Sequence, residues 1–240
     1  MFRNLYNKVV QFLKKQLYKF DMSNVKKVLI IAPHPDDESI GMGGFLEKYA
    51  EKCEIILLTN GASGNPELGK EKTIEVRRQE FEDVMEHLGV KKYYMLGIAD
   101  KEAKKHLSVL KPYLTNEYDY IFIPSRDDIH QDHGCIYKYV NKIVKRRRLK
   151  GIIVEYEVWS PLRNPNYFLD ISDCFKEKEI TIQKYVSQIR RTQYDWGSLG
   201  LNMYRGMMSG YRYAEAYYIN KRWISKVLDK MKKFKDKMEK

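Results

Sequence analysis

Short apolar segments alternate with longer helix-like segments along most of the chain, and this alternation constrains the fold more than any other feature. The apolar segments are rich in β-branched residues, and several end at a proline or at the turn pair Asn60-Gly61. Strands separated by helices of this length pair in parallel through right-handed crossovers, which places helices on both faces of the sheet. We therefore predict an α/β fold, doubly wound around a mostly parallel sheet. The expected strands are 25–32, 53–59, 93–96, 118–124, 151–158 and 167–171, and the expected helices are 41–51, 70–88, 101–114, 133–148 and 174–194.

One domain is the simplest organisation of this 240-residue chain, because no repeat, low-complexity linker or mid-chain composition shift divides it. Hydrophobic residues make up 43% of the chain and aromatic residues 13%, which excludes wholesale disorder. No apolar run reaches the ~18 residues that a membrane span needs, because lysine or arginine interrupts every candidate. The cysteines lack paired spacing, which favours a reducing compartment over a disulfide scaffold; they are Cys53, Cys135 and Cys174.

The loop after strand 25–32 is the first place to look for reactive side chains, because Rossmann-like sheets bind ligands beyond the carboxyl ends of their strands. His34 and Asp37 are three residues apart in this loop, so a tight turn after Pro35 can aim both at one point. An imidazole nitrogen and a carboxylate oxygen form a ligand pair suited to Zn²⁺ and similar ions. Asp36 then faces elsewhere and is free to handle protons.

Two other interpretations of this loop need no metal. In the first, Asp36, Asp37 and Glu38 merely cap the next helix, whose N-terminal end favours negative charge. In the second, the nearby glycines form a dinucleotide-binding loop, which requires G-x-G-x-x-G directly after the strand. Gly41 and Gly43 come several residues late, and the acids before them would repel a pyrophosphate, so this second interpretation is the weakest.

The loop after strand 118–124 supplies two of the protein's five histidines, at the same edge of the sheet as His34. His133 completes a His-Asp-His set with an open position for water, as in catalytic rather than structural zinc sites. His130 lies one turn away, close enough for proton transfer, and Asp132 can fix the tautomer of a ring from behind. A lone histidine is usually structural, but ligand types from two separate strand-end loops favour a shared site.

Four motifs follow one another along roughly residues 25–219. They are PHPDDE with GMGG after it, Arg77-x-x-Glu80 before His87-Leu88-Gly89, HQDH at 130–133, and a late stretch from Arg205-Gly206 to Tyr213-Ala214-Glu215-Ala216. Together and in this order they resemble the PIG-L/LmbE family of zinc-dependent N-acetylglucosaminide deacetylases. Gln131 replaces a proline that many members carry, at a position that is not a ligand.

The resemblance implies a role for each group in the two loops. His34, Asp37 and His133 would bind the metal, Asp36 would act as general base, and His130 would act as general acid or oxyanion stabiliser. The implied cofactor is Zn²⁺, and the same ligand set also accepts Fe²⁺ and other divalent ions. The implied reaction removes the N-acetyl group from an N-acetylated amino sugar of a glycan or glycoconjugate and releases acetate. The competing hypothesis is a catalytically silent sugar-binding or membrane-scaffold protein on the same fold.

Arg77 falls inside the apolar stripe of helix 70–88, so its guanidinium needs an acceptor. One interpretation is a structural pair with a carboxylate such as Glu80. The resemblance instead implies contact with a sugar or phosphate, and we predict Arg77 as a substrate-binding residue. Asp195-Trp196 and the tyrosine-rich stretch 204–218 could stack on sugar rings, but aromatic residues are more often part of a core.

The formal net charge of +12 belongs to the two ends of the chain. Residues 1–20 carry +5 and residues 221–240 carry +6, whereas 21–220 is nearly neutral. We therefore predict a deacetylase domain over 21–220, flanked by two basic amphipathic helices. These helices either pack on the domain or pair in a homo-oligomer, or they lie on an anionic membrane surface.

The basic ends do not indicate secretion or nucleic-acid binding. Lysines interrupt the apolar positions of 1–20, and no small-residue cleavage site follows them, so this segment is not a secretory signal. The basic cluster 145–150 ends a predicted helix, where cations are favourable, and no nucleic-acid-binding module accompanies it. The predicted location is the cytoplasm, with peripheral contact at the inner face of the membrane.

Overall fold

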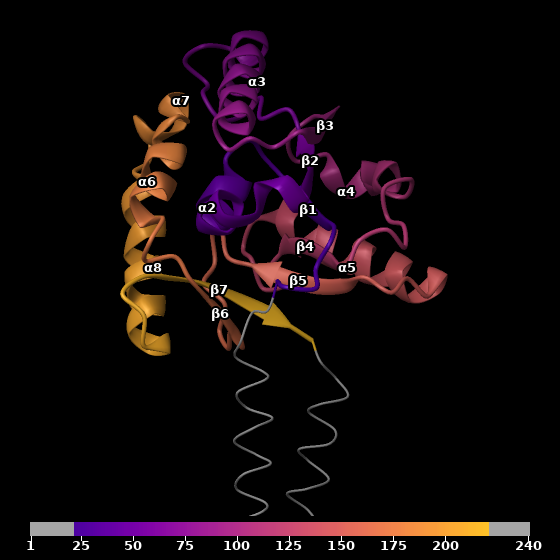
Figure 1. The fold of residues 1–240 in the computed structure, drawn as a ribbon. Helices are drawn as coiled ribbons and strands as arrows, with labels where there is room; N and C mark the ends of the chain where they lie inside the picture. Colours follow the sequence, from indigo (N-terminus) through magenta and orange to yellow (C-terminus); the bar gives the residue numbers. More distant parts are fainter. Residues whose placement is uncertain (1–21, 221–240) are drawn as a thin grey trace, which may run out of the picture.

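The computed structural model describes residues 22–220, which form one seven-stranded sheet in the order β3-β2-β1-β4-β5-β7-β6 (Figure 1). The two predicted terminal helices, 1–20 and 221–240, lie outside the described residues. The strands are β1 (Val28–Ala32), β2 (Cys53–Thr59), β3 (Lys92–Ile98), β4 (Tyr120–Pro124), β5 (Ile152–Tyr156), β6 (Tyr167–Asp170) and β7 (Ala214–Ile219). The helices are α2 (Asp37–Tyr49), α3 (Lys70–His87), α4 (Ala103–His106), α5 (Gln131–Arg147), α6 (Phe175–Gln183), α7 (Val186–Ile189) and α8 (Tyr194–Ser209), with 3₁₀ turns η1 (Ala50–Lys52) and η2 (Leu107–Leu110).

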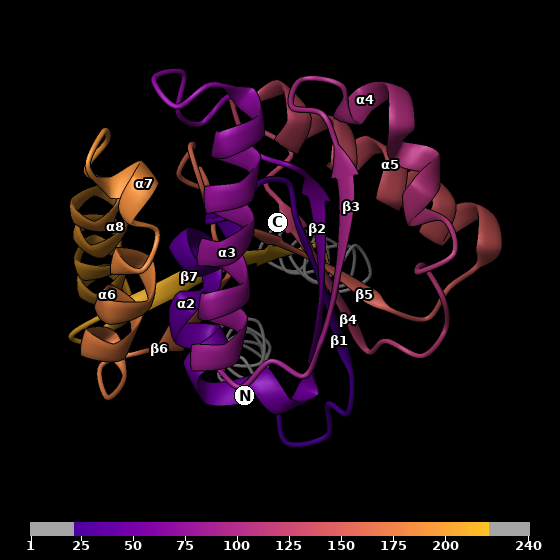
Figure 2. The same ribbon diagram turned by 90° about the horizontal axis from the view of Figure 1, so that it is seen from above.

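The sheet is mostly parallel and covered on both faces, which confirms the predicted fold class. Strands β3, β2, β1, β4 and β5 pair in parallel, and β7 pairs antiparallel with both β5 and β6. Seen from above, α2 and α3 lie on one side of the sheet with α6, α7 and α8, and α4 and α5 lie on the other (Figure 2).

Strand β1 shows why the central strands are continuous apolar runs. All five of its residues are buried, and successive side chains enter different cores. Val28 and Ile30 pack in the core that contains Phe45 of α2, whereas Leu29 belongs to the core that contains Ile136 of α5. A strand with helices on both faces has no solvent side, so its sequence shows no polar alternation.

Several predicted elements differ from the structure. Helix α8 and strand β7 were not predicted. Three glycines interrupt the apolar pattern of α8, and a buried glutamate interrupts the apolar pattern of β7. The predicted helix 174–194 is two helices, α6 and α7, and 101–114 is the short α4 followed by η2. Helix α2 begins at Asp37 rather than at 41, so the acidic residues of the first loop already belong to its first turn.

The glycines of α2 allow close packing, which explains them without a nucleotide. A Cβ on Gly41 would lie 2.4 Å from the backbone oxygen of Glu157, and one on Gly44 would lie 2.5 Å from the side chain of Ile171. Both glycines are inside the helix rather than in the loop before it. The dinucleotide-binding interpretation is therefore wrong.

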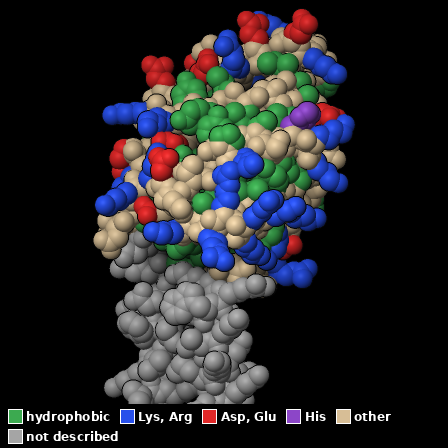
Figure 3. Space-filling model, turned by 90° about the vertical axis from the view of Figure 1, so that its right-hand side faces the viewer, with side chains coloured by type: hydrophobic (Ala, Val, Ile, Leu, Met, Phe, Trp, Pro, Cys, Tyr) green, Lys and Arg blue, Asp and Glu red, His purple; other side chains and the backbone are tan. Residues whose placement is uncertain are grey.

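Figure 3 shows the face of the molecule over β3, α4 and α5. Hydrophobic side chains lie in its centre, and lysine and arginine side chains surround them. On this face the positive charges do not form one continuous stripe. Within residues 22–220, every helix is too short or too polar to span a membrane.

The neighbouring strands β1 and β4 position the functional site. They pair directly, with Val28 opposite Tyr120, so the loops that follow them leave the sheet side by side. The chain runs outward from β1 to β2 and β3 and returns to β4 on the other side of β1. Ligands bind at such topological switch points in α/β sheets.

Candidate active site

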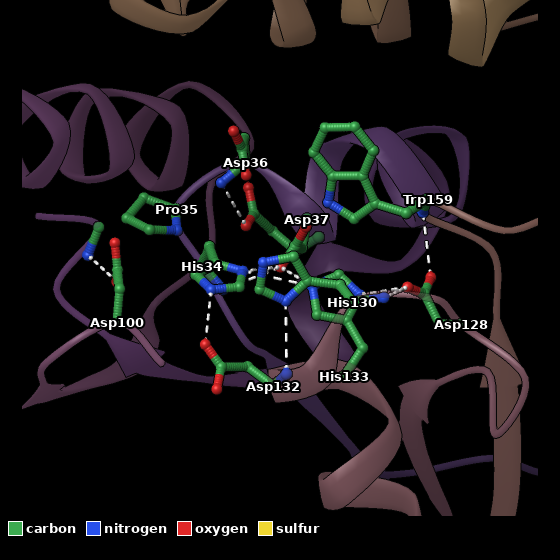
Figure 4. A network of polar contacts seen from close by, with 12 residues as sticks. His34, Pro35, Asp36, Asp37, Asp100, Asp128, His130, Asp132, His133 and Trp159 are labelled. Carbon is green, nitrogen blue, oxygen red and sulfur yellow. Dashed lines mark hydrogen bonds and ion pairs between the residues drawn. The ribbon is translucent and has the colours of Figure 1, made fainter. Parts of the chain in front are cut away.

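Three ligand atoms from the two loops form a nearly regular triangle at the carboxyl edge of the sheet (Figure 4). His34 Nδ1 lies 3.1 Å from Asp37 Oδ2, His133 Nε2 lies 3.2 Å from the same oxygen, and the two imidazole nitrogens are 3.3 Å apart. Ligand atoms about 2.1 Å from a tetrahedral zinc ion are about 3.4 Å from one another, so the triangle is close to one face of such a site. The structure thus brings together the three residues that we predict as metal ligands.

A third histidine ring completes the cluster. The ring centroid of His130 lies 4.7 Å from those of both His34 and His133, and all three histidines offer ligand atoms within 4.8 Å of one another. His130 is half-buried, whereas His133 is fully buried and His34 is 9% exposed. The three histidines could also hold a metal ion, but the shorter distances to Asp37 favour the triangle. That assignment leaves His130 at the more exposed side of the cluster.

The local sequence explains how these side chains converge. The carboxylate of Asp37 accepts a hydrogen bond from the backbone N–H of His34 at 2.8 Å, which closes the turn that leads into α2. His130 immediately precedes α5, and its Nδ1 accepts the backbone N–H of Asp132 at 3.4 Å as an N-cap. His133 follows in the first turn of α5, so one helix start presents both histidines.

Asp132 is the carboxylate that the sequence predicts behind a histidine ring, and the structure places it behind His34. Its Oδ2 lies 3.3 Å from His34 Nε2 and accepts the backbone N–H of Lys101 at 2.9 Å. A carboxylate in this position fixes the tautomer and the orientation of a metal-binding imidazole.

Asp128 plays the same part for His133, although its spacing in the sequence does not indicate this. Its Oδ1 lies 3.4 Å from His133 Nδ1 and accepts the backbone N–H of His130 at 2.9 Å. Its Oδ2 accepts the backbone N–H of Trp159 at 3.0 Å. Spacing alone does not tell which of the adjacent residues Asp127 and Asp128 faces inward, so no pattern could have selected it.

The cluster is electrostatically suited to a cation. Burial lowers the pKa of His34, but hydrogen bonds to Asp132 and Asp37 outweigh it and raise the pKa to about 10. Burial also lowers the pKa of His133, but the charge of Asp37 and the contact with Asp128 outweigh this effect and raise the pKa to about 9. Burial raises the pKa of Asp37, but the two imidazoles outweigh this effect and hold the pKa well below the usual range. Negative charge therefore dominates the centre of the site.

Asp36 and Arg77 form a buried ion pair next to the triangle. Arg77 Nη2 donates to Asp36 Oδ2 at 2.9 Å and to the backbone carbonyl of Pro35, and Nη1 donates to the carbonyl of Gly61 at 3.4 Å. Burial raises the pKa of Asp36, the charge of Arg77 opposes this, and the resulting pKa is about 7. A carboxylate with a pKa near neutrality is suited to general base catalysis.

Arg77 forms the structural pair with a carboxylate that one interpretation predicts, but its partner is Asp36 rather than Glu80. Glu80 accepts hydrogen bonds from the backbone N–H and the hydroxyl of Ser187, both at 2.7 Å. The acceptor of Arg77 is Asp36, 41 residues away and on another element, which helical spacing cannot identify. The Nε atom of Arg77 is buried and has no hydrogen-bond partner among residues 22–220.

The backbone of Asp36 adopts a conformation that only glycine reaches without strain. Its φ is 132°, and its carbonyl accepts the backbone N–H groups of Ser39 and Ile40 at 3.0 and 2.9 Å. Strain of this kind is retained where the surroundings over-determine it, most often at functional sites. The conformation lets the adjacent carboxylates of Asp36 and Asp37 face different partners, one the guanidinium and the other the histidines.

A third strand-end loop also contributes, through Asp100 after β3. Its carboxylate accepts the backbone N–H groups of Gly61 and Ser63 at 2.9 and 2.7 Å, which holds the loop whose carbonyl contacts Arg77. Asp100 is not among the predicted site residues. It could have been found, because α/β sheets bind ligands beyond the carboxyl ends of their strands and Asp100 follows such an end.

The late motif of the sequence holds α2 in place. Glu215 of β7 accepts the backbone N–H of Gly44 at 2.7 Å, across 171 residues of sequence. Lys178 of α6 is fully buried and donates to Glu215 at 2.8 Å and to the carbonyl of Ile40 at 2.9 Å. The helix whose first turn carries Asp37 is therefore tied to elements that come much later in the chain.

Comparisons with known proteins show that the chain is similar to deacetylases. Residues 29–144 match the family model PIG-L, GlcNAc-PI de-N-acetylase. The diacetylchitobiose deacetylase of Thermococcus kodakarensis is 28% identical over 221 residues, which cover 80% of this chain and 82% of that protein. A probable N-acetyl-alpha-D-glucosaminyl L-malate deacetylase 2 of Bacillus cereus is 23% identical over 186 residues, covering 68% of this chain and 84% of that protein.

A solved structure shows the same likeness in three dimensions. The N,N'-diacetylchitobiose deacetylase from Pyrococcus horikoshii superposes with a TM-score of 0.72 at 27% identity, over 91% of this chain and 92% of that chain. The match to the family model spans both loops that build the histidine cluster. The resemblance read from the motifs is thus confirmed: the chain is similar to deacetylases of the PIG-L type in sequence and in fold.

Proposed function

We propose that this protein is a metal-dependent hydrolase that removes the N-acetyl group from an N-acetylated amino sugar and releases acetate. The observation that carries the proposal is the triangle of His34, Asp37 and His133 with a separate carboxylate, Asp36, beside it. One set of groups is available for a cation and another for a proton. The relatives are deacetylases whose names specify diacetylchitobiose and N-acetylglucosaminyl malate, which supports a GlcNAc-type substrate.

Zn²⁺ is the cofactor that we propose, held by His34, Asp37 and His133. Two imidazoles and one carboxylate in a facial triangle are typical of catalytic zinc sites, which keep one position open. Such an ion supplies Lewis acidity, which polarises the acetyl carbonyl and increases the acidity of water. Asp128 and Asp132 hold the two histidine rings in the orientation that this requires.

Asp36 and His130 divide the proton transfers of amide hydrolysis. Asp36 accepts a proton as water adds to the acetyl carbon, and Arg77 keeps its carboxylate in position. His130 donates a hydrogen bond to the developing oxyanion or a proton to the sugar nitrogen, and the C–N bond then breaks to leave acetate and a free amine. We also propose Arg77 as a substrate contact, supported by its buried and unpartnered Nε within the described part of the chain.

Acetate release tests this function directly. The full-length protein is incubated with N-acetylglucosamine, diacetylchitobiose, N-acetylglucosaminyl malate and lipid-linked N-acetylglucosamine, with and without a chelator. We expect acetate from at least one conjugate, abolished by the chelator and restored by Zn²⁺. Bound zinc without acetate from any conjugate would instead favour the silent sugar-binding or scaffold protein.

For the rest of the chain, we propose that the domain of 21–220 is a cytoplasmic enzyme body that its basic ends hold at the inner face of a membrane. The support is the distribution of charge, with +5 on 1–20 and +6 on 221–240 beside a nearly neutral body. Polybasic segments gain roughly 1 kcal/mol per residue near an anionic lipid surface. Pairing of the same segments in a homo-oligomer is the alternative.

A further inference from the structure

We propose that the indole of Trp159 is a platform for the sugar ring of the substrate, next to the histidine cluster and supported by Tyr194. This inference rests on the proposed function and specifies how the sugar is held. Trp159 lies in the loop after β5, and in Figure 4 its indole and Asp36 are on the same side of the histidine rings. The side chain is 43% exposed, so the indole is accessible to a ligand.

The backbone of Trp159 is tied to the residue that orients a metal ligand. Its N–H donates to Asp128 Oδ2 at 3.0 Å, and the N–H of Ser160 donates to the same oxygen at 3.2 Å. The other oxygen of Asp128 lies 3.4 Å from His133 Nδ1. One carboxylate therefore contacts both the backbone that carries the indole and the imidazole, so the fold holds the Trp159 loop next to the histidine cluster.

The same loop is held from two further directions. The hydroxyl of Ser160 accepts the backbone N–H of Ile129 at 3.0 Å, in the loop that carries the catalytic histidines. Arg205 Nη2 donates to Glu157 at 2.5 Å and to the carbonyl of Leu162 at 2.8 Å, which fixes both ends of the segment around Trp159. Arg205 of the late sequence motif therefore holds the loop that carries Trp159. A platform held in this way loses little conformational entropy when a ligand binds.

Tyr194 of α8 supports the indole from the side. The two ring centroids are 5.2 Å apart with an interplanar angle of 88°, an edge-to-face contact. Tyr194 is half-buried, so the ring that the indole packs against is itself held by the protein.

The chemistry of the exposed surface matches a pyranose ring. The face of an indole carries negative charge density and attracts the polarised C–H groups on the apolar face of a sugar. Ile129, directly before His130, is 82% exposed and adds apolar surface beside the same loop. A sugar placed on this surface directs its 2-acetamido group toward the histidine cluster, whereas a small N-acetyl amide without a ring has nothing to place there.

Steady-state kinetics of full-length variants test the platform. We expect Trp159→Ala to raise KM for diacetylchitobiose about tenfold, equivalent to about 1.4 kcal/mol, with a smaller effect on kcat. Trp159→Phe should restore most of the affinity because it keeps an aromatic face, and zinc content should stay unchanged in both variants. Trp196→Ala is the matched control, since Trp196 is 68% exposed on the helix of Tyr194. A KM for Trp159→Ala within about twofold of wild type would overturn the inference.

A binding measurement separates this inference from the proposed function. Diacetylchitobiose is titrated into the Asp36→Asn variant while tryptophan fluorescence is recorded. We expect a change that survives an added Trp196→Phe substitution and disappears with Trp159→Phe. If that change occurs but no conjugate releases acetate, the proposed hydrolase activity fails and the platform stands. A change that depends on Trp196 instead, or no change at all, overturns the platform.

Discussion

At the scale of single residues, the neighbours Asp36 and Asp37 have opposite electrostatic environments. Burial raises the pKa of Asp36 to about 7, because one guanidinium only partly compensates for the loss of water. Asp37 is also buried, but contacts with two imidazoles hold its pKa well below the usual range. One carboxylate is therefore able to take up a proton near neutral pH, while the other stays ionised and available as a ligand.

This difference predicts distinct effects of two substitutions. Asp36→Asn should retain metal and lose about 10²–10⁴-fold in turnover, because it removes the general base but none of the ligands. His133→Ala should lose the metal itself, because one corner of the triangle is missing. Elemental analysis and acetate release, measured on the same samples, check both.

The control is His106→Ala, which removes an exposed histidine far from both loops in sequence and should change neither quantity. Wild-type turnover in Asp36→Asn would show that Asp36 is not the base. Full metal content in His133→Ala would mean that the ion is held by a different set of residues.

At the scale of elements, the position of α2 depends on a buried ion pair between α6 and β7. Lys178 and Glu215 are both almost fully buried, and together they contact the backbone of α2 at Ile40 and Gly44. A buried pair of this kind contributes little net stability when both charges are present, but it is costly to leave half of it in place.

We expect Lys178→Met to lower the free energy of unfolding by about 3–5 kcal/mol, because it leaves the Glu215 carboxylate buried without its cation. The double variant Lys178→Met/Glu215→Gln should recover part of this loss. Urea unfolding measures both. Lys176→Met is the matched control, since it breaks an exposed pair with Glu179 on the same helix. A loss for Lys178→Met no larger than that of the control would contradict the assignment.

At the scale of the whole molecule, the charge separates into a body and two ends. The segment 21–220 is nearly neutral, although the complete chain carries +12. The carboxylates of Asp37, Asp128 and Asp132 surround the histidine cluster, so the excess positive charge of the chain is not part of the candidate site. The basic ends therefore bear on where the enzyme works rather than on what it does.

Co-sedimentation with lipid vesicles tests this division. The full-length chain should sediment with vesicles that contain phosphatidylglycerol, less so with pure phosphatidylcholine, and the 21–220 variant should stay in the supernatant with both. The reason is the roughly 1 kcal/mol that each basic residue contributes near an anionic surface. Equal sedimentation of the two chains would exclude membrane contact through the ends, and gel filtration would then show whether they pair two copies.

Much of the fold could be predicted because parallel strands covered on both faces are continuous apolar runs, bounded by turn residues. The prediction failed where that relation breaks down. Helix α8 contains Gly197, Gly200 and Gly206 among aromatic residues, so its helical period is hidden. Strand β7 is antiparallel and carries the buried Glu215, whose partner Lys178 lies on another element.

Features that depend on short spacing could be predicted from the residues alone. These are the turn that brings His34 and Asp37 together, the helix start that presents His130 and His133, and the placement of both at strand ends. The groups that face these residues depend on how the sheet and helices assemble. Asp36 pairs with Arg77, and Asp128 contacts the ring of His133. The backbone N–H of Trp159 donates to the carboxylate of Asp128 as well. Local spacing follows from backbone geometry over a few residues, whereas these partners come from segments that meet only when the sheet is assembled.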